Sequence, residues 1–268
     1  MKKGLIALLI ILMVIALVGC NSTEQPSEQG EQTGEEQAEQ GEVKKLIVGT
    51  SADFPPFENL EVVDGKETIV GFDIDLINEI AKELGVEVEI QDMDFNGLVA
   101  AVQSDKIDLA IAGMTPDDDR REKVDFSDPY FYASQTILVK EEVKDEYASM
   151  DDMVGKIVGS QLGTTSDDVI SEFEGVEVKK YNKVNDAVLD LNNGRLDAVI
   201  LEDSIADAYV ERNPGLVVIV PEGLNEGEEP FAIALAKGQD ELLNDINQAL
   251  QKIKDSGKYD ELIKKWFE

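Results

Sequence analysis

Residues 107–120 read IDLAIAGMTPDDDR and join a short apolar run to an acidic turn. The run is too short for a helix and is rich in β-branched Ile, so it predicts a buried strand that Gly113 and Pro116 end. The strand end offers backbone N–H groups, the Thr115 hydroxyl and the Arg120 guanidinium, a set of donors that suits a carboxylate. When this stretch is taken alone, a surface arginine paired with its aspartate neighbours explains it better. The carboxylate-binding interpretation therefore needs support from the rest of the chain.

The composition limits the classes of function. The chain has 268 residues, 43% of them hydrophobic, which allows one large domain or two lobes of about 100 residues each. A formal net charge of −33 argues against nucleic acid as a partner, because phosphate binding needs a basic face. The chain contains no His and one Cys, so we expect no imidazole catalysis, no intramolecular disulfide, no metal and no cofactor. Its acidity is typical of the solvated surface of an exported protein.

The N-terminus predicts export and lipid anchoring. Two lysines precede an apolar run at residues 5–18, which is short for a membrane span, and the only Cys of the chain, Cys20, follows directly after Gly19. This pattern resembles the lipobox of bacterial lipoproteins, so residues 1–20 are expected to be a lipoprotein signal peptide. Cys20 would then be the mature N-terminus and carry the lipid, palmitate included. The alternative is an uncleaved anchor with an incidental Cys.

The next segment, residues 21–43, contains Glu, Gln, Gly, Ser and Thr and almost no large apolar residue. Such a segment cannot bury a core, so we expect a disordered acidic tether.

Folded sequence is expected from residue 44. Residues 45–49 predict a strand, and the loop behind it carries Phe54 and Phe57 beside two prolines, either as an aromatic platform or as the loop's own small core. Residues 74–84 place apolar side chains on one helical face, with Asp73 as the expected N-cap and Gly85 as the C-cap. Helix-start capping explains Asp73 better than a catalytic role does.

The chain then repeats itself in order. Residues 156–160 echo residues 45–50, and residues 185–200 echo residues 96–111, each time as a helix, a polar turn and an Asp before an apolar strand. These echoes imply two α/β lobes of like topology. If the second lobe interrupts the first, two strands must cross between them, and residues 136–140 and 231–237 are the candidates.

The register of the echo aligns Asp108 with Asp197, and therefore Gly113 with Glu202 rather than with Asp203. Glu202 is thus expected at the mouth of its strand, facing Gly113. In the alternative, both acids simply begin the next helix, where negative charge is favourable anyway. Between the echoes, residues 161–168 place hydroxyls at a helix start, which is either an anion site or ordinary capping.

With these pieces collected, residues 43–267 resemble the family 3 bacterial extracellular solute-binding proteins, the amino-acid receptors of ABC importers. The most specific motif is GFDIDL at residues 71–76, continued by Ile80, Ala81 and Leu84. Weaker matches are AGMT at residues 112–115, DFS at residues 125–127, GTT at residues 163–165 and the C-terminal segment 257–267.

The resemblance implies an α/β, two-lobe periplasmic-binding-protein-like fold of type II with two hinge-crossing strands. Lobe 1 would comprise residues 44–136 and 232–268, and lobe 2 residues 137–231. The cleft between them would close on one free amino acid. We expect a monomer that presents the amino acid to ABC transporter permease subunits on the outer face of the bacterial cytoplasmic membrane, facing the periplasm where a second membrane exists.

The resemblance also implies roles for single residues. Phe54 and Phe95 match positions that pack on the ligand's side chain. Gly113, Thr115 and Arg120 match positions that bind the α-carboxylate and help to seat the ammonium.

From lobe 2, Thr164 and Thr165 match helix-start donors, and Glu202 matches the acid that takes the α-ammonium. Ser51 stands where several receptors for basic amino acids have an acid, which weakens a lysine or arginine assignment without excluding it, because Asp53 and Gln161 are near. Ser51, Asp53 and Gln161 complete the set of expected ligand-binding residues. The ligand is therefore expected to be a polar amino acid, glutamine or a basic one.

A function of another class is an extracytoplasmic enzyme, because some dehydratases acting on prephenate or arogenate resemble this fold. Such an enzyme needs a buried general acid beside the leaving group of its substrate. The acidic residues of the cleft are better used on an ammonium group, so we expect a binding protein and not an enzyme.

Overall fold

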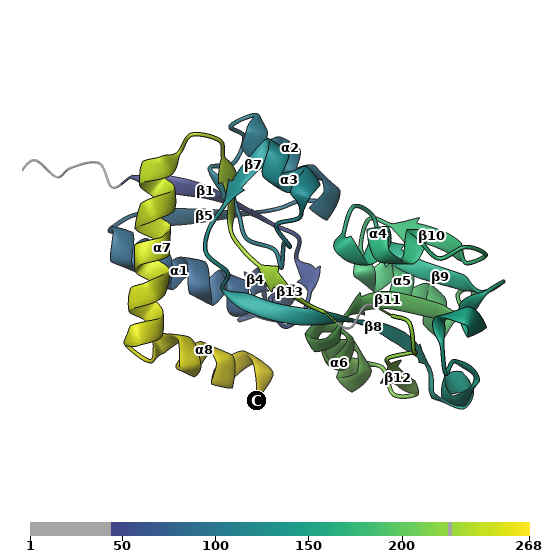
Figure 1. Ribbon diagram of the computed structural model, residues 1–268. Coiled ribbons are helices and arrows are strands. Elements are labelled where there is room, and N and C mark those ends of the chain that lie inside the picture. The colour runs from purple at the N-terminus through teal and green to yellow at the C-terminus, as the bar shows by residue number, and fades with distance from the viewer. Residues whose placement is uncertain (1–43, 225–226) are drawn as a thin grey trace, which may run out of the picture. The chain divides into compact units, whose positions relative to one another are not determined.

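The computed structural model describes residues 44–224 and 227–268 (Figure 1). The expected signal peptide, Cys20 and the acidic tether lie outside the described residues. The strands are β1 Lys45–Thr50, β2 Asp53–Phe54, β3 Glu58–Val63, β4 Lys66–Val70, β5 Glu87–Asp92, β6 Leu109–Ala110, β7 Val124–Phe126, β8 Phe131–Lys140, β9 Ile157–Gln161, β10 Glu177–Tyr181, β11 Ala198–Glu202, β12 Leu216–Ile219, β13 Glu228–Phe231 and β14 Ala234–Ala236. The α-helices are α1 Phe72–Leu84, α2 Leu98–Gln103, α3 Asp118–Lys123, α4 Thr165–Ser171, α5 Val184–Asn192, α6 Asp203–Arg212, α7 Asp240–Asp255 and α8 Lys258–Phe267, and short 3-10 helices cover Phe95–Gly97, Glu141–Glu146 and Met150–Met153.

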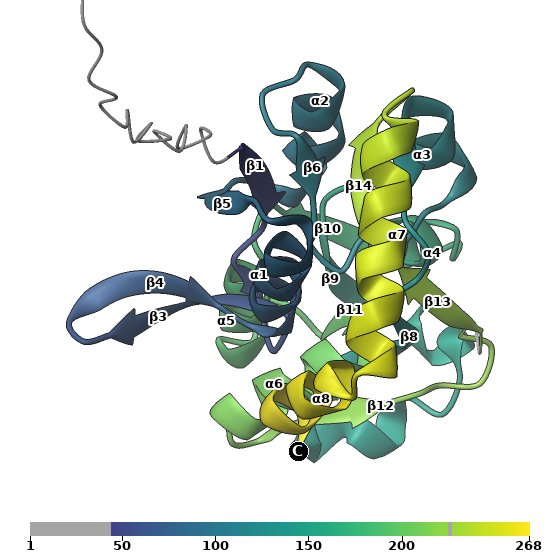
Figure 2. The ribbon, with the colours of Figure 1, turned by 90° about the vertical axis from the view of Figure 1, so that its left-hand side faces the viewer.

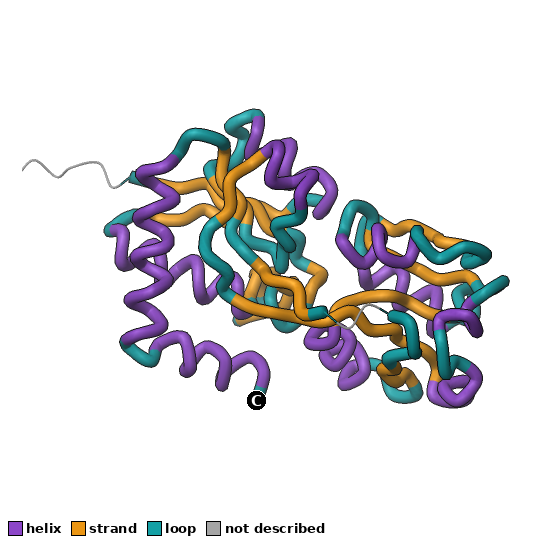
Figure 3. Tube along the Cα trace, viewed as in Figure 1, coloured by secondary structure: helices purple, strands orange, loops and turns teal. Residues whose placement is uncertain are grey.

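Two sheets organise the described chain. One has the strand order β5-β1-β6-β14-β7, and the other has the order β10-β9-β11-β8-β12 with β13 paired to β8. A smaller third sheet has the order β2-β3-β4. Figure 3 shows the strands of the two larger sheets flanked by helices. We call the part around the first sheet lobe 1 and the part around the second sheet lobe 2. In lobe 1, β1 pairs in parallel with β5 and β6, and β14 pairs antiparallel with β6 and β7. In lobe 2, β9 pairs in parallel with β10 and β11, and β8 pairs antiparallel with β11.

The internal echo is confirmed by equivalent hydrogen bonds in the two lobes. The Asp108 carboxylate accepts from the backbone N of Ile47 at 2.7 Å, and the Asp197 carboxylate accepts from the backbone N of Ile157 at 2.8 Å. In return, each aspartate's own backbone N donates to the carbonyl of the same strand residue. Each Asp therefore closes the turn between helix and strand onto the first strand of its lobe, which explains why the same residue recurs at the same place.

The lobes are connected through β8 and β13, which lie side by side between the two sheets (Figure 1). The N-terminal half of β8 pairs with β13, and its C-terminal half pairs with β11 and β12 of lobe 2. The expected strand 136–140 is thus the lobe 2 half of a longer strand that begins at Phe131. The expected strand 231–237 is wrong as one piece, because β13 ends at Phe231 and β14 begins at Ala234. Between them, the backbone N–H of Ala232 donates to Met114 O, so the chain changes partners there and leaves the hinge ladder.

The signature segment holds α1 against the first loop. Gly71 has φ 148°, and a Cβ there would lie 1.9 Å from the carbonyl oxygen of Phe57, so only glycine fits. Gly85 ends the helix in the left-handed conformation, as predicted. The prediction of Asp73 as N-cap is wrong, because the helix begins at Phe72 and Gly71 is the N-cap. The buried Asp73 carboxylate instead accepts from the Gly113 N–H at 3.0 Å and from the Tyr130 hydroxyl at 2.7 Å.

An aromatic cluster lies where the first loop, α1, the two connecting strands and the C-terminal helix meet. Phe57 is fully buried at its centre, and its ring centroid lies 4.9 to 6.0 Å from those of four other phenylalanines. These are Phe72, Phe131, Phe231 and Phe267. The cluster anchors the end of the chain beside the connecting strands, because Phe267 lies in α8 and Phe131 and Phe231 lie in β8 and β13. In contrast, the β3–β4 hairpin, which turns at Asp64-Gly65, projects from the body with exposed residues along both strands (Figure 2).

Candidate ligand-binding site

One pocket is lined by nine of the eleven side chains expected at the site, and its lining contains no other residue. Lobe 1 contributes residues from the end of β2, from the segments that follow β5 and β6, and from α3. Lobe 2 contributes residues from the ends of β9 and β11 and the start of α4. The lining residues are Phe54, Phe95, Gly113, Thr115, Arg120, Gln161, Thr164, Thr165 and Glu202. This position beyond the carboxyl ends of strands is where α/β sheets bind small ligands. Ser51 and Asp53 lie in a neighbouring network instead.

Arg120 is held rigidly at the lobe 1 side of the pocket. Asp117 caps α3 by accepting from the backbone N of Arg120 at 2.7 Å, and its second oxygen lies 3.1 Å from Arg120 Nε. Arg120 Nη1 donates to Thr115 O at 2.6 Å, and Nη2 donates to Gly163 O of lobe 2 at 2.8 Å. The guanidinium carbon lies 5.4 Å from the centroid of the Phe95 ring. These contacts fix the orientation of the guanidinium.

Arg120 is also a buried charge in an acidic setting. Its side chain is 9% exposed, and burial lowers its pKa below the usual value. The charges of Asp117, Asp168, Glu202 and Glu229 act in the opposite direction and raise the pKa. The guanidinium stays charged at neutral pH and can bind a carboxylate through parallel hydrogen bonds.

On lobe 2, the start of α4 forms the opposite wall. Thr164 is the N-cap, and its hydroxyl accepts from the backbone N of Asp167 at 3.1 Å while donating to Gln161 O at 2.8 Å. Ordinary capping thus occupies the Thr164 hydroxyl, as one of the two sequence interpretations expects. The Thr165 hydroxyl lies 3.4 Å from Gln135 Nε2 and lines the pocket. Gln161 lines it too, with Nε2 donating to Asn182 O at 3.1 Å.

The structure distinguishes Glu202 from Asp203. Glu202 ends β11, is 4% exposed and lines the pocket, whereas Asp203 begins α6 and accepts from the backbone N of Ser204 at 2.7 Å. Burial, together with the charge of Glu229, raises the pKa of Glu202 to about 7. A carboxylate in this setting gains from a cationic partner, because ionisation without one is costly.

Two residues beside the pocket were missed by the sequence analysis. Gln135, from the middle of β8, is 1% exposed, and its Oε1 accepts from the Ser166 hydroxyl at 2.7 Å. Gln135 Nε2 lies 3.5 Å from a carboxylate oxygen of Glu202 and 3.5 Å from one of Glu229. Glu229 comes from β13 and also accepts from the Thr115 hydroxyl at 3.3 Å. The sequence shows Gln135 only as a polar residue in an apolar strand and Glu229 only as one acid in an acidic loop.

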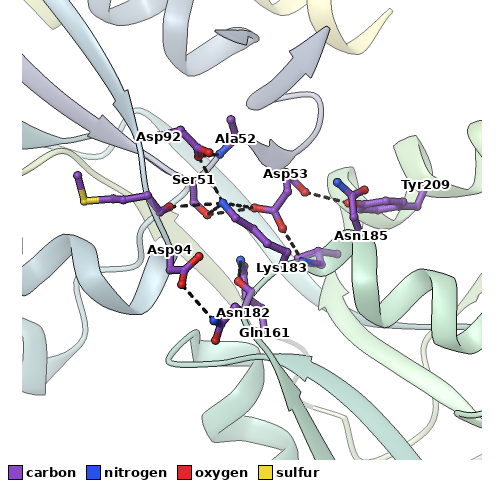
Figure 4. A network of polar contacts seen from close by, with 12 residues as sticks. Ser51, Ala52, Asp53, Asp92, Asp94, Gln161, Asn182, Lys183, Asn185 and Tyr209 are labelled. Atoms are coloured by element: carbon purple, nitrogen blue, oxygen red, sulfur yellow. Dashed lines mark hydrogen bonds and ion pairs between the residues drawn. The ribbon is translucent and has the colours of Figure 1, made fainter. Parts of the chain in front are cut away.

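Ser51 and Asp53 belong to a polar network that joins the two lobes (Figure 4). Asp53 is 3% exposed and accepts from the backbone N of Val184, at the start of α5, at 2.5 Å. Lys183 Nζ lies 3.2 Å from the Ser51 hydroxyl, 3.3 Å from Asp92 Oδ1 and 3.6 Å from Asp53 Oδ1. The carboxylate expected to contact the ligand is therefore occupied by an ammonium group of the chain itself.

A buried support lies behind Gly113. Its φ of 55° is in the left-handed region, and a Cβ there would lie 2.7 Å from the Phe54 ring. Its N–H is shared by the Asp73 carboxylate and the Tyr130 hydroxyl, 3.1 Å away. Burial raises the pKa of Asp73 to about 6, and burial together with the charge of Asp73 raises that of the enclosed Glu58 well above its usual value. The signature aspartate thus supports the Gly113 loop that lines the pocket.

Residues 44–224 and 227–268 contain no cluster of side chains that could hold a metal ion. Within the same ranges, every helix is too short or too polar to cross a membrane.

Comparisons with known proteins agree with this geometry. The family model described as "Bacterial extracellular solute-binding proteins, family 3" matches residues 46–268. The arginine-binding extracellular protein ArtP of Bacillus subtilis is 38% identical over 270 residues, covering 100% of this chain and 98% of its own. A probable histidine-binding protein of Campylobacter jejuni is 34% identical, covering 99% of each chain.

Among solved structures, the amino acid ABC transporter substrate-binding protein AbpA of Streptococcus pneumoniae, bound to L-arginine, superposes with a TM-score of 0.80. It is 38% identical, and the match covers 83% of this chain and 94% of that one. The type II two-lobe fold expected from the signature is confirmed by this likeness together with the two sheets and their connecting strands. The comparisons support substrate binding and not the dehydratase-like alternative.

Proposed function

This chain belongs to the bacterial extracellular solute-binding proteins, family 3, and we propose that it captures a basic amino acid, with arginine as the first candidate. Its work is that of a substrate-binding protein of an amino-acid ABC importer: it holds the ligand between its two lobes and delivers it to the permease. The proposal includes that this chain binds its ligand without catalysing a reaction.

The observation that carries this proposal is the placement of opposite charges in one pocket. Arg120 approaches from lobe 1, while Glu202 approaches from lobe 2, and both line the same cavity. An α-amino acid carries a carboxylate and an ammonium on neighbouring atoms, so it can satisfy both groups at once. The ligand would then receive a partner from each lobe, and the arrangement with both lobes in contact gains interactions that separated lobes lack.

The acidic surroundings favour a cationic side chain. Arg120 is already matched by Asp117, so Glu202 and Glu229 leave the pocket with an excess of negative charge. A ligand with a net positive charge reduces this excess, which a neutral amino acid does not. Phe54 and Phe95 supply apolar faces on which the stem of a long side chain can pack. The arginine-binding relatives support the same class of ligand.

Several further features belong to the proposal. Residues 44–136 with 232–268 would be lobe 1, and residues 137–231 would be lobe 2. Cys20, after removal of residues 1–20, would carry the lipid and tether a monomeric receptor to the outer face of the cytoplasmic membrane. An extracellular site of action is stated by the description of the family itself.

A thermal-shift screen of the amino acids tests this function. A ligand present at 100 times its Kd adds about 2.7 kcal/mol to the stability of the folded state. We expect arginine to give the largest shift, followed by other basic amino acids. A screen in which no amino acid shifts the transition would refute the proposal, and conversion of prephenate or arogenate to aromatic product would favour the enzyme.

A further inference from the structure

Glu229 is a carboxylate beside the pocket that the expected ligand set does not include. It lies on β13, where it pairs with Ala133 of β8, so it is part of the connection between the lobes and lies off the main strand order of the lobe 2 sheet. Its Oε2 accepts from the Thr115 hydroxyl of lobe 1 at 3.3 Å and lies 3.5 Å from Gln135 Nε2. The carboxylate therefore reaches a residue that lines the pocket from the hinge side.

The same amide nitrogen serves Glu202. Gln135 Nε2 lies 3.5 Å from Glu202 Oε1, and the Gln135 oxygen is held by the Ser166 hydroxyl at 2.7 Å, which fixes which end of the amide faces the acids. Two carboxylates thus converge on one neutral donor, and both contacts are long for a hydrogen bond. An amide N–H cannot neutralise two charges, so the space around it suits a cation.

The electrostatics of the pocket agree with this geometry. The charge of Glu229 raises the pKa of both Glu202 and Arg120, so Glu229 acts on both charged groups of the pocket. Glu202 itself is fully enclosed and Glu229 half-buried, which means that neither charge is well screened by water. The free protein therefore holds two nearby acids whose repulsion a ligand ammonium would relieve.

We propose that Glu229 is a second carboxylate partner of the ligand's α-ammonium, so that the ammonium is held between Glu202 at the end of β11 and Glu229 on the hinge strand β13. This rests on the proposed function and extends it. The α-ammonium would thereby contact lobe 2 and the hinge together, while the α-carboxylate contacts Arg120 of lobe 1. Because every amino acid carries this ammonium, the role of Glu229 does not depend on which side chain the receptor prefers.

A cycle of protein and ligand changes tests the proposal. Titration calorimetry on the full chain compares Glu229→Gln with the unmodified chain, using arginine, citrulline and 5-guanidinopentanoate, which is arginine without its ammonium. We expect Glu229→Gln to weaken arginine and citrulline by the same factor, about 10- to 100-fold, since hydrogen bonds between charged groups are lost. Binding of 5-guanidinopentanoate, weak from the start, should not fall further.

The neighbouring Glu228→Gln is the matched control, because Glu228 is exposed on the same strand and alternate strand residues face opposite sides. It removes the same charge and should leave all three affinities within about twofold. The proposal is overturned if Glu229→Gln leaves arginine binding unchanged, or if it weakens 5-guanidinopentanoate as much as arginine. If it weakens arginine and not citrulline, Glu229 acts on the side chain and the ammonium assignment is wrong. If the unmodified chain binds no amino acid, the proposed function itself fails.

Discussion

Lys183 is predicted to act as a latch between the lobes. It precedes α5 in lobe 2, yet all the acceptors of its ammonium are in lobe 1: Ser51, Asp92, Asp53 and the carbonyl of Met93. Figure 4 shows the lysine reaching across into this group. Because these contacts require both lobes to be in place, replacing Lys183 by Met should weaken the form in which the lobes touch and spare each lobe separately.

The size of the effect follows from the burial of the partners. The Lys183 side chain is 26% exposed, Asp92 is 33% exposed and Asp53 is 3% exposed. Exposed ion pairs contribute about 0.2–1 kcal/mol, and hydrogen bonds to buried charged groups about 1.5–3 kcal/mol. The latch lies between these cases, so we expect a loss of about 1–2 kcal/mol, or about 5- to 30-fold in Kd for the amino acid.

Titration calorimetry with arginine measures the affinity, and small-angle scattering with and without ligand measures the compactness of the chain. Saturating ligand should reduce the radius of gyration, and ligand-free Lys183→Met should be no more compact than the unmodified chain. Lys179→Met is the matched control, because Lys179 pairs with Asp190 at 2.7 Å within lobe 2. Equal affinities for both variants and the unmodified chain would refute the latch, and a radius of gyration that ligand does not change would indicate a rigid pocket.

Four further outcomes are expected. Arg120→Lys should weaken arginine binding roughly 30-fold or more and nearly as much as Arg120→Ala, because an ammonium cannot replace the two-pronged guanidinium; recovery of most of the affinity by Lys would place Arg120 outside the site. Glu202→Gln should weaken binding of the amino acid by about 3–5 kcal/mol, or roughly 150- to 5,000-fold in affinity, whereas Asp203→Asn should weaken it by under about 1 kcal/mol. Calorimetry that shows the reverse would make Asp203 the ligand-binding acid. The pKa of Glu202 is raised from 4.5 to about 7, so the contribution of its protonated carboxyl group to the stability of the ligand-free chain is full below pH 4.5 and is lost as the pH rises through 7. Ligand binding needs the carboxylate and should therefore weaken below pH 7. Glu202→Gln should flatten both pH profiles. Gly113→Ala should lower both stability and affinity, because its Cβ would press on Phe54. Gly65→Ala, with a similar positive φ and open space around it, should lower stability alone, by about 1 kcal/mol in melts of the ligand-free chain. Equal affinities of the two variants would show that the Gly113 loop does not shape the pocket.

Much of the architecture could be predicted from local pattern. The echo between the lobes correctly paired Asp108 with Asp197, because each closes the same turn by the same two hydrogen bonds. The helix ends at Gly85 and the hairpin turn at Gly65 were also predictable, since left-handed backbone there favours glycine. The two glycine turns depend on residues close in sequence, whereas the Asp108 and Asp197 bonds reach 61 and 40 residues along the chain and were predictable because the same pattern recurs in both lobes.

The errors arise where a side chain acts at long range. Asp73 has the appearance of a helix cap, but its burial brings its carboxylate to Gly113, 40 residues away. Phe54 and Phe57 seemed to share one role, whereas Phe54 lines the pocket and Phe57 is the centre of the aromatic cluster. Asp53 was expected at the ligand, but Lys183, whose position depends on how the lobes meet, lies beside it.

The candidate site divides in the same way. The nine residues that line the pocket were found by motif and by the rule that ligands bind beyond strand ends, while their individual roles stay predictions. Gln135 and Glu229 could not be found, because nothing in a strand pattern tells which residue of a hinge strand faces a cleft. Their position depends on the pairing of β8 with β13, which no local spacing encodes.

The most direct test of the account is native mass spectrometry of the chain mixed with equimolar amounts of the twenty amino acids. We predict that one arginine per chain forms the dominant complex, and that the Arg120→Ala variant, folded by its circular dichroism spectrum, loses it. A chain that carries no amino acid, or an arginine complex that survives Arg120→Ala unchanged, would contradict the assignment of this pocket.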